Sequence, residues 1–287
     1  MLAVCKHELR MYFQTLTAYV FGAFLLVVVG IGAMLYNLQA AVSNFEYVLS
    51  FSRLVFAVIV PILTMRTLAE ERRQRTDQLL YSLPISTLQV ILGKYLALLA
   101  VFLAPLCLIA VYPLVFAQFG EVYLPTSYGS LFAFFLLGAA LLAVGLFLSS
   151  LTENQGFAAG LSVAVILFNY YSVTLSEYVT ATTQASALAL FVLAAGAGLL
   201  VKALTRSENL AIAVGLPLMA AVVIVYFLDA GLFEGLLPDI MSALSLFERL
   251  NVFVNGVFDL TAVVFYLSVA AFFLFLSVQS LEKRRYN

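Results

Sequence analysis

The strongest constraint on this chain is a succession of long apolar runs. They occupy residues 16–38, 50–66, 90–117, 130–151, 157–175, 186–204, 210–228 and 261–281. Each run is near or above the length of about 20 residues that a helix needs to cross a bilayer. None alternates as the strands of a membrane barrel would. Backbone groups in lipid must be hydrogen-bonded within their own segment, so we expect helices. The sequence predicts an all-α, polytopic transmembrane bundle of about eight spans, forming a single domain over residues 1–287.

The composition agrees with a lipid environment. Apolar residues make up 64% of the chain and charged residues only 10%, whereas soluble domains have about 45–50% and about 25%. A single water-soluble core could not bury so much apolar surface. We therefore exclude a soluble enzyme, a disordered protein and a nucleic-acid binder.

Basic residues predict the orientation of the spans. All Lys and Arg residues except Arg53 and Arg249 fall at the N-terminus, at the C-terminus, in the connection after the second run or in the one after the sixth. The alternate connections carry acidic residues instead: Glu46, Glu121, Glu177, Asp229, Glu234, Asp239, Glu248 and Asp259. Because basic residues favour the cytoplasmic side, both termini are expected there. Both termini lie on one side of the membrane only if the number of spans is even. Eight spans meet this condition, and six would also meet it if two of the runs did not cross.

Motifs for catalysis, metal binding and ATP binding are missing from the sequence. His7 is the sole histidine, and Cys5 and Cys107 are the only cysteines. A phosphate-binding loop ends in Gly-Lys-Ser or Gly-Lys-Thr, but Gly93 and Lys94 precede a tyrosine. The sequence therefore predicts no catalytic residue, no metal site and no cofactor on this chain.

Two stretches in the middle of the chain resemble each other. Residues 153–161 and 208–216 share Glu, Asn, Ala, Gly and Leu at matching positions. Each follows a helix-start pattern, Thr152-x-x-Gln155 in one and Thr205-x-x-Glu208 in the other. A duplicated helical hairpin and a chance similarity between apolar helices both account for this.

The connection after the second run, residues 67–86, is the most informative stretch. Its leucines can share one face of a helix while charges surround them. Pro84 should end that helix, and Ser86-x-x-Gln89 should begin the next as a capping box. Two interpretations of residues 67–86 remain. The segment is either an ordinary solvated loop with no partner or a docking element for a soluble partner. The residues expected to dock or to anchor this helix are Glu70, Glu71, Arg72, Arg73, Thr76, Leu79, Leu80, Leu83 and Pro84.

Residues 61–86 resemble the permease subunits of ABC-2 type transporters, in particular the branch associated with gliding motility. Residues 93–95, 149–155 and 247–285 extend the similarity. The resemblance implies a bacterial plasma-membrane exporter built from two permease chains, identical or related. It also implies a cytoplasmic ATPase subunit under each permease chain, and this subunit binds ATP and magnesium. Residues 67–86 would then be the coupling helix that contacts the ATPase. Members usually have six spans, so residues 176–228 would be a two-span insertion.

The sequence thus predicts an ATP-driven export permease with an unidentified substrate and no activity of its own. The alternatives are an ATP-independent secondary transporter or channel, and a membrane anchor for a soluble complex. A secondary transporter should show charges inside the membrane or broken helices in matched halves. Residues 231–259 are expected to form an extracellular or re-entrant segment, either an external gate or a helical cap.

Overall fold

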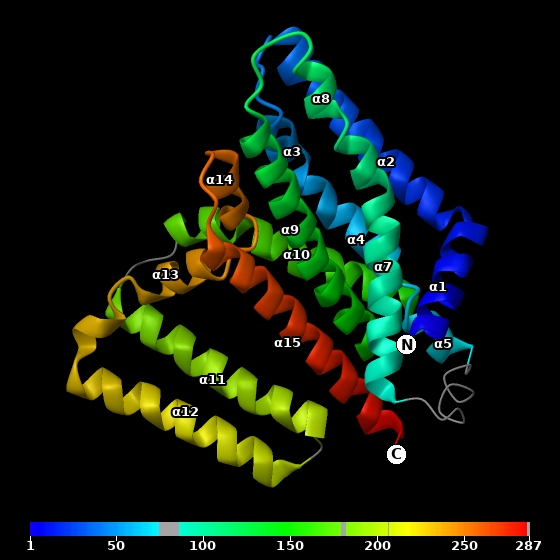
Figure 1. Cartoon of the computed structure of the whole chain (residues 1–287). Helices are drawn as coiled ribbons and strands as arrows, with labels where there is room; N and C mark the ends of the chain where they lie inside the picture. Colours follow the sequence, from blue (N-terminus) through cyan, green and yellow to red (C-terminus); the bar gives the residue numbers. More distant parts are fainter. Residues whose placement is uncertain (75–85, 179–181, 206, 286–287) are drawn as a thin grey trace. The chain divides into compact units, whose positions relative to one another are not determined.

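A computed structural model describes residues 1–74, 86–178, 182–205 and 207–285 (Figure 1). All regular structure in these residues is helical, which confirms the predicted all-α class. Seven helical segments are long and apolar enough to cross a membrane. They are Leu16–Gln39, Glu46–Arg73, Thr87–Phe116, Leu124–Leu151, Gln155–Tyr178, Glu208–Leu228 and Leu260–Lys283.

An eighth span is reached if Ala230–Ala243 and Glu248–Val254 are counted together, as a broken span or a re-entrant loop. The run predicted at 186–204 lies on α11 (Thr183–Thr205), whose apolar stretch Thr183–Leu199 is shorter than the others. The described residues therefore hold seven or eight candidate spans.

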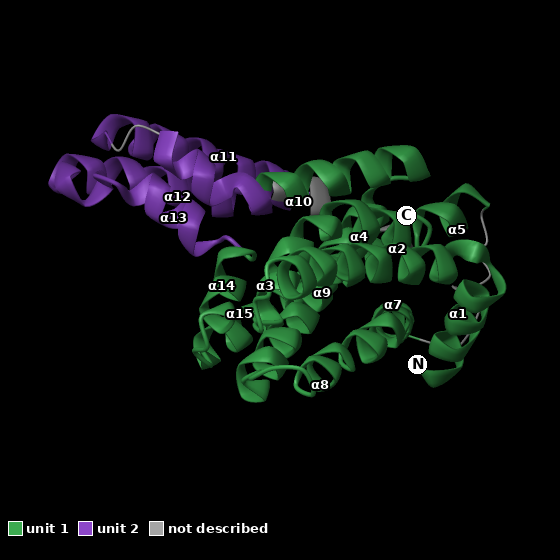
Figure 2. Cartoon of the chain, turned by 90° about the horizontal axis from the view of Figure 1, so that it is seen from above, with its two compact units in different colours: residues 1–168, 246–285 green, residues 169–245, 286–287 purple. Residues whose placement is uncertain are grey.

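The helices fall into two compact units, coloured separately in Figure 2. One contains residues 1–168 and 246–285, and the other contains residues 169–245. The prediction of a single permease domain remains a prediction.

The first unit is organised around α9 (Leu124–Leu151), most of whose residues are buried. It packs against α3 (Glu46–Ser52), α4 (Phe56–Thr64), α7 (Thr87–Ile109), α14 (Glu248–Val254) and α15 (Leu260–Arg285). Gly138 lets aromatic rings approach α9 closely, since an added Cβ would lie 3.1 Å from Cε1 of Phe56 and closer still to the ring of Phe102. Phe56 also lies 4.6 Å from Phe134, measured between ring centroids.

Regular α-helix is interrupted at three places in the N-terminal part of this unit. α1 (Leu2–Gln14) ends at Thr15, whose extended backbone starts α2 (Leu16–Ala33) in a new direction. α2 continues as the π-helical turn η1 (Met34–Gln39). The run predicted at 90–117 is divided into α7 and α8 (Tyr112–Phe116), and the break precedes Pro113. Proline disfavours helical backbone in the residue before it and is tolerated in a first helical turn.

The α4 region contains the corner on which the candidate site depends. A short 3₁₀ turn, η2 (Arg53–Val55), joins α3 to α4, and a turn after Thr64 leads to α5 (Ala69–Arg73). Gly145 of α9 faces this corner, because an added Cβ would lie 3.0 Å from Cβ of Thr64. The absence of a side chain at Gly145 thus allows α4 to pack closely on α9 (Figure 1).

Short hydrogen bonds attach α14 to its neighbours in the first unit. Arg53 donates to Oδ1 of Asn251 at 2.8 Å, and Ser130 of α9 donates to the carbonyl of Phe253 at 3.0 Å. Tyr266 of α15 donates to the carbonyl of Leu246, just before α14, at 2.8 Å. These bonds tie α14 to η2 and α9, and the residue Leu246 before it to α15.

The second unit contains a helical hairpin, α11 with α12 (Glu208–Leu228), followed by η3 (Ala230–Phe233) and α13 (Leu236–Ala243). The hairpin backbones approach at Gly198 and Gly215, where a Cβ on Gly198 would lie 3.1 Å from Cα of Gly215. Gly160 occupies the position matching Gly215 in the internal similarity, yet a Cβ there would meet nothing within 4 Å. Gly215 therefore allows close packing of two helices, whereas Gly160 does not have this role in the structure.

The two helices of that similarity, α10 (Gln155–Tyr178) and α12, begin two residues later than the patterns at Thr152 and Thr205 predict. The predicted capping residues, Thr152 and Thr205, are wrong. Oδ1 of Asn154 accepts the N–H groups of Gly156 and Phe157, and Oγ of Ser207 accepts the N–H of Leu210. A capping side chain must sit directly before the first helical residue to reach these donors.

Candidate functional site

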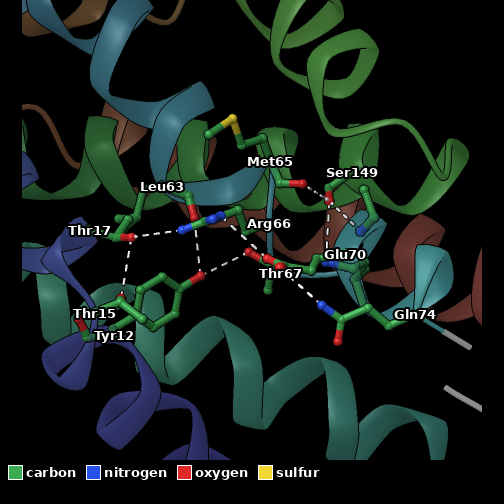
Figure 3. A network of polar contacts seen from close by, with 12 residues as sticks. Tyr12, Thr15, Thr17, Leu63, Met65, Arg66, Thr67, Glu70, Gln74 and Ser149 are labelled. Atoms are coloured by element: carbon green, nitrogen blue, oxygen red, sulfur yellow. Dashed lines mark hydrogen bonds and ion pairs between the residues drawn. The ribbon is translucent and has the colours of Figure 1, made fainter. Parts of the chain in front are cut away.

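The candidate site is the corner between α4 and α5, where α1, α7 and α9 of the first unit meet these two helices. Figure 3 shows Ser149 of α9 directed at this corner. Its Oγ accepts the N–H of Leu68 at 3.3 Å and that of Ala69 at 3.2 Å, and it lies 3.3 Å from the carbonyl of Met65, to which it donates. The first N–H groups of a helix lack partners within the helix. One buried side chain of α9 therefore completes the start of α5.

Tyr12 attaches α1 to the same corner (Figure 3). Its hydroxyl donates to the carbonyl of Leu63 at 3.1 Å and is hydrogen-bonded to Oγ1 of Thr67, also at 3.1 Å. Burial raises the pKa of the Tyr12 phenol, because the charged phenolate would be desolvated. The phenol is therefore a stable neutral donor that holds α1 against the end of α4.

Lys94 connects three helices through its ammonium group. The side chain is 1% exposed, and Nζ lies 2.5 Å from Oε1 of Glu8 on α1 and 2.6 Å from Oε1 of Glu71 on α5. Its third bond, at 3.1 Å, goes to the carbonyl of Thr67 in the corner. An ammonium has three donors, and all three are used. We call Lys94, Glu8, Glu71 and the Thr67 carbonyl the Lys94 clamp.

The clamp places α1 and α7 in close contact. A Cβ added to Gly93 would lie 2.9 Å from Cβ of Val4, so only glycine fits beside α1 at this position. The carboxylate of Glu8 is thereby held beside Lys94, although 86 residues separate the two in sequence. The close approach of the backbones at Gly93 and the ion pair between Glu8 and Lys94 both hold α1 against α7.

The charges of α5 are divided between an inward and an outward side. Glu71 is directed to Lys94, and Arg72 is buried. Arg73 is exposed. Glu70 is partly exposed and pairs with Nε of Arg66 at 3.3 Å, while its other oxygen accepts from Gln74 at 3.2 Å (Figure 3). Exposed pairs of this kind contribute little to stability. The outward side of α5 thus carries the partly exposed Glu70 and the exposed Arg73.

The structure brings together only part of the predicted site. Glu70, Glu71, Arg72 and Arg73 form α5 and its charges, as described above. The remaining predicted residues, Thr76, Leu79, Leu80, Leu83 and Pro84, lie outside the described residues, so the continuation of the coupling helix stays a prediction. The capping box is confirmed: Oγ of Ser86 accepts from the N–H of Gln89, and Oε1 of Gln89 accepts from the N–H of Ser86.

Four residues of the site were missed by the sequence analysis: Glu8, Tyr12, Lys94 and Ser149. A signal existed for two of them, because Glu8 and Tyr12 are four residues apart and share one face of α1. Lys94 carried a cytoplasmic charge and lay within the family resemblance at residues 93–95, but neither signal indicated its carboxylate partners. Nothing in the sequence distinguishes Ser149 from the neighbouring Ser150.

The cavities of the first unit are largely apolar. One of about 540 Å³ lies between α2 with η1 and α7 with α8, and Gly30, Met34, Leu108 and Tyr112 contribute to its walls. Within the described residues, no group of three His, Cys, Asp or Glu side chains is placed to hold a metal ion. The site is a junction of helices, with Glu71 of α5 directed to Lys94 and Arg73 exposed.

Comparison with known proteins identifies the family. Residues 31–228 match the family described as ABC-2 family transporter protein, and they make up more than half of the chain. The match includes both α5 and the hairpin of α11 and α12. No curated protein is similar enough to the chain to count as a relative. The chain belongs to the ABC-2 transporter family and forms a multi-span membrane permease domain of that family.

Proposed function

We propose that the chain is the permease subunit of an exporter driven by a separate cytoplasmic ATPase. The observation that carries the proposal is the triple attachment of α5, to α9 through Ser149 and to α1 and α7 through Lys94. A force applied to α5 is passed directly to three helices of the bundle. This is the property that a coupling element requires.

In the proposed cycle, ATP and magnesium bind to two ATPase subunits, one beneath each permease chain. Their closure displaces α5. The Lys94 clamp and Ser149 transmit the displacement to α1, α7 and α9, and the spans rearrange between inward-open and outward-open states. The second permease is a copy of this chain or a related one, and the bacterial plasma membrane is the expected location.

The finer family assignment also belongs to this proposal. We place the chain in the branch associated with gliding motility, and we interpret residues 176–228 as two additional spans. The similarity of residues 61–86 and 247–285 supports the branch. The family match covers residues 31–228 and so includes 176–228; topology mapping must decide whether these residues are an insertion.

The direct test is co-purification of an ATPase from mild detergent with the full chain. Arg73→Glu should lower recovery of the ATPase, because Arg73 is the exposed charge of α5. Lys202→Glu is the matched control, since it reverses an exposed basic residue on α11. Equal recovery with both variants would contradict docking at α5, and failure to recover any ATPase would contradict the proposed function.

One observation favours an ATP-independent secondary transporter instead. Lys94 and its two carboxylates form a buried charged cluster at the end of a candidate span, and such clusters can couple transport to ions. Uptake or efflux in vesicles separates the two functions. A carrier would respond to an imposed proton or sodium gradient without ATP, whereas the proposed exporter requires ATP and its partner.

A further inference from the structure

The cavity of about 540 Å³ lies between the first and third candidate spans. One wall is the end of α2 with η1, and the other is the end of α7 with α8 (Figure 1). Both walls leave regular α-helix within the cavity, because α2 continues as the π-helical turn Met34–Gln39 and α7 ends at Ile109, ahead of Pro113. Helices bend at π-helical turns and at prolines. The two walls therefore do not pack closely here, and a space remains between them.

Small residues widen this space, and packed aromatic rings support part of its wall. On α2, Gly30 and Ala33 share one face and bring almost no side chain into the cavity. A Cβ added to Gly30 would meet only the hydroxyl of Tyr112 within 4 Å, at 3.9 Å. The rings of Tyr112 and Phe116 pack on Phe45, which is fully buried, with centroid distances of 5.9 Å and 6.3 Å. The aromatic wall is thus held in place and does not collapse into the space.

The chemistry of the walls disfavours water as the occupant. The side chains that line the cavity are apolar except for the hydroxyl of Tyr112. A water molecule held inside a protein needs about two to four polar partners. Closely packed proteins also tolerate few voids much larger than a water molecule. The walls therefore favour an apolar occupant.

The cavity opens toward the surface that a membrane covers. Met34 and Leu108 both line it, and they are 52% and 58% exposed. They lie on the candidate spans Leu16–Gln39 and Thr87–Phe116. The phase that surrounds a span is the hydrocarbon of the bilayer. An apolar molecule would therefore enter the cavity from the bilayer.

We propose that this cavity binds one acyl chain of a phospholipid from the surrounding bilayer. Its volume falls in the range of ordinary ligand pockets, about 300–1,000 Å³, and a flexible chain can follow a space whose two walls are bent. A second copy of this protein would need a protruding apolar segment of matching shape, whereas acyl chains surround the spans at high concentration. A bound chain gives the lining atoms the neighbours that a void would deny them. It would thus complete the packing between the first and third candidate spans.

The test uses the full chain in phosphatidylcholine nanodiscs and involves no ATPase, so it can fail independently of the proposed function. A small share of the phosphatidylcholine carries a photoreactive diazirine on its acyl chain, and mass spectrometry locates the labelled residues after illumination. Residues 264–275 of α15 report ordinary contact with lipid, because Val264, Leu267, Phe272 and Phe275 are exposed. We expect residues 108–116 to be labelled at least about threefold more, because a pocket surrounds most of the surface of its ligand.

Gly30→Leu should lower the labelling of residues 108–116 to that of residues 264–275, because the new side chain fills the space. Gly30→Ala adds one methyl group, should lower the labelling in part, and keeps the test decisive if the larger side chain unfolds the protein. Gly160→Leu is the matched control, since a Cβ there would meet nothing within 4 Å, and it should leave the labelling of residues 108–116 unchanged. Hydrogen exchange of residues 124–151 reports whether each variant is folded.

Two results would overturn the proposal directly. They are equal labelling of the two segments in the unaltered chain, and labelling of residues 108–116 that survives Gly30→Leu in a folded protein. Cross-links from residues 108–116 to a second copy of the chain would also overturn it, since that copy would then occupy the cavity.

Discussion

Nζ of Lys94 lies 2.6 Å from Oε1 of Glu71, and this ion pair joins α7 to α5 at the corner where α4 ends. The same nitrogen lies 2.5 Å from Glu8 of α1. One buried cation is therefore shared by two carboxylates from helices that are far apart in sequence. Disturbing it should affect both stability and coupling.

Lys94→Met should destabilise the chain by about 3–5 kcal/mol, because removal of one partner leaves buried charge without compensation. Thermal unfolding of the full chain in detergent measures the effect. Adding Glu8→Gln and Glu71→Gln to Lys94→Met should restore part of the lost stability, since the neutral amides carry no charge. Lys202→Met, which removes an exposed pair with Glu208, should leave unfolding unchanged. An unaltered transition in Lys94→Met would show that the clamp does not stabilise the fold.

Ser149→Ala should weaken the start of α5 by about 1–3 kcal/mol, because the N–H groups of Leu68 and Ala69 lose their acceptor. Hydrogen exchange at these two amides should accelerate. The adjacent Ser150→Ala is a close control, since Oγ of Ser150 is buried and has no hydrogen-bond partner among the described residues. Similar exchange in the two variants would contradict the role assigned to Ser149.

Gly145→Ala should destabilise the contact of α4 with α9 by about 1–3 kcal/mol through overpacking. The new methyl group would lie 3.0 Å from Cβ of Thr64, which is itself fully buried. Gly160→Ala on α10 should be neutral or stabilising, because its Cβ would meet nothing within 4 Å. The two variants can be compared by thermal unfolding in the same detergent. A loss of stability confined to Gly160→Ala would refute this description of the packing.

Membrane topology can be mapped with single cysteines after Cys5 and Cys107 are replaced by serine. Reporters at Glu177 and Asp239 should react with an impermeant reagent from outside the cell. Reporters at Gln74 and Asn287 should react only after permeabilisation, because the distribution of basic residues predicts cytoplasmic termini. Labelling of a cysteine at Thr205 from outside would remove the two-span insertion and require a six-span topology.

Much of the fold follows from local sequence signals. Long apolar runs predicted the approximate limits of the long helices, because a bilayer requires a minimum length of apolar helix. Ser86 and Gln89 set the start of α7, because a capping box needs only residues three apart. The charges after the second run also marked the region of α5, and the family match agrees with the class of protein that this region suggested.

The tertiary structure decided how the helices are rotated and which polar groups meet. Apolar spans have nearly uniform faces, so their sequences do not indicate which side turns toward a neighbour. Lys94 resembles any basic residue at a membrane boundary until α1 and α5 bring Glu8 and Glu71 to it. Likewise, Ser149 differs from Ser150 only because the backbone of Leu68 and Ala69 lies beside it. These pairings depend on contacts between distant segments, and they determine the inward direction of Glu71 and the outward direction of Arg73.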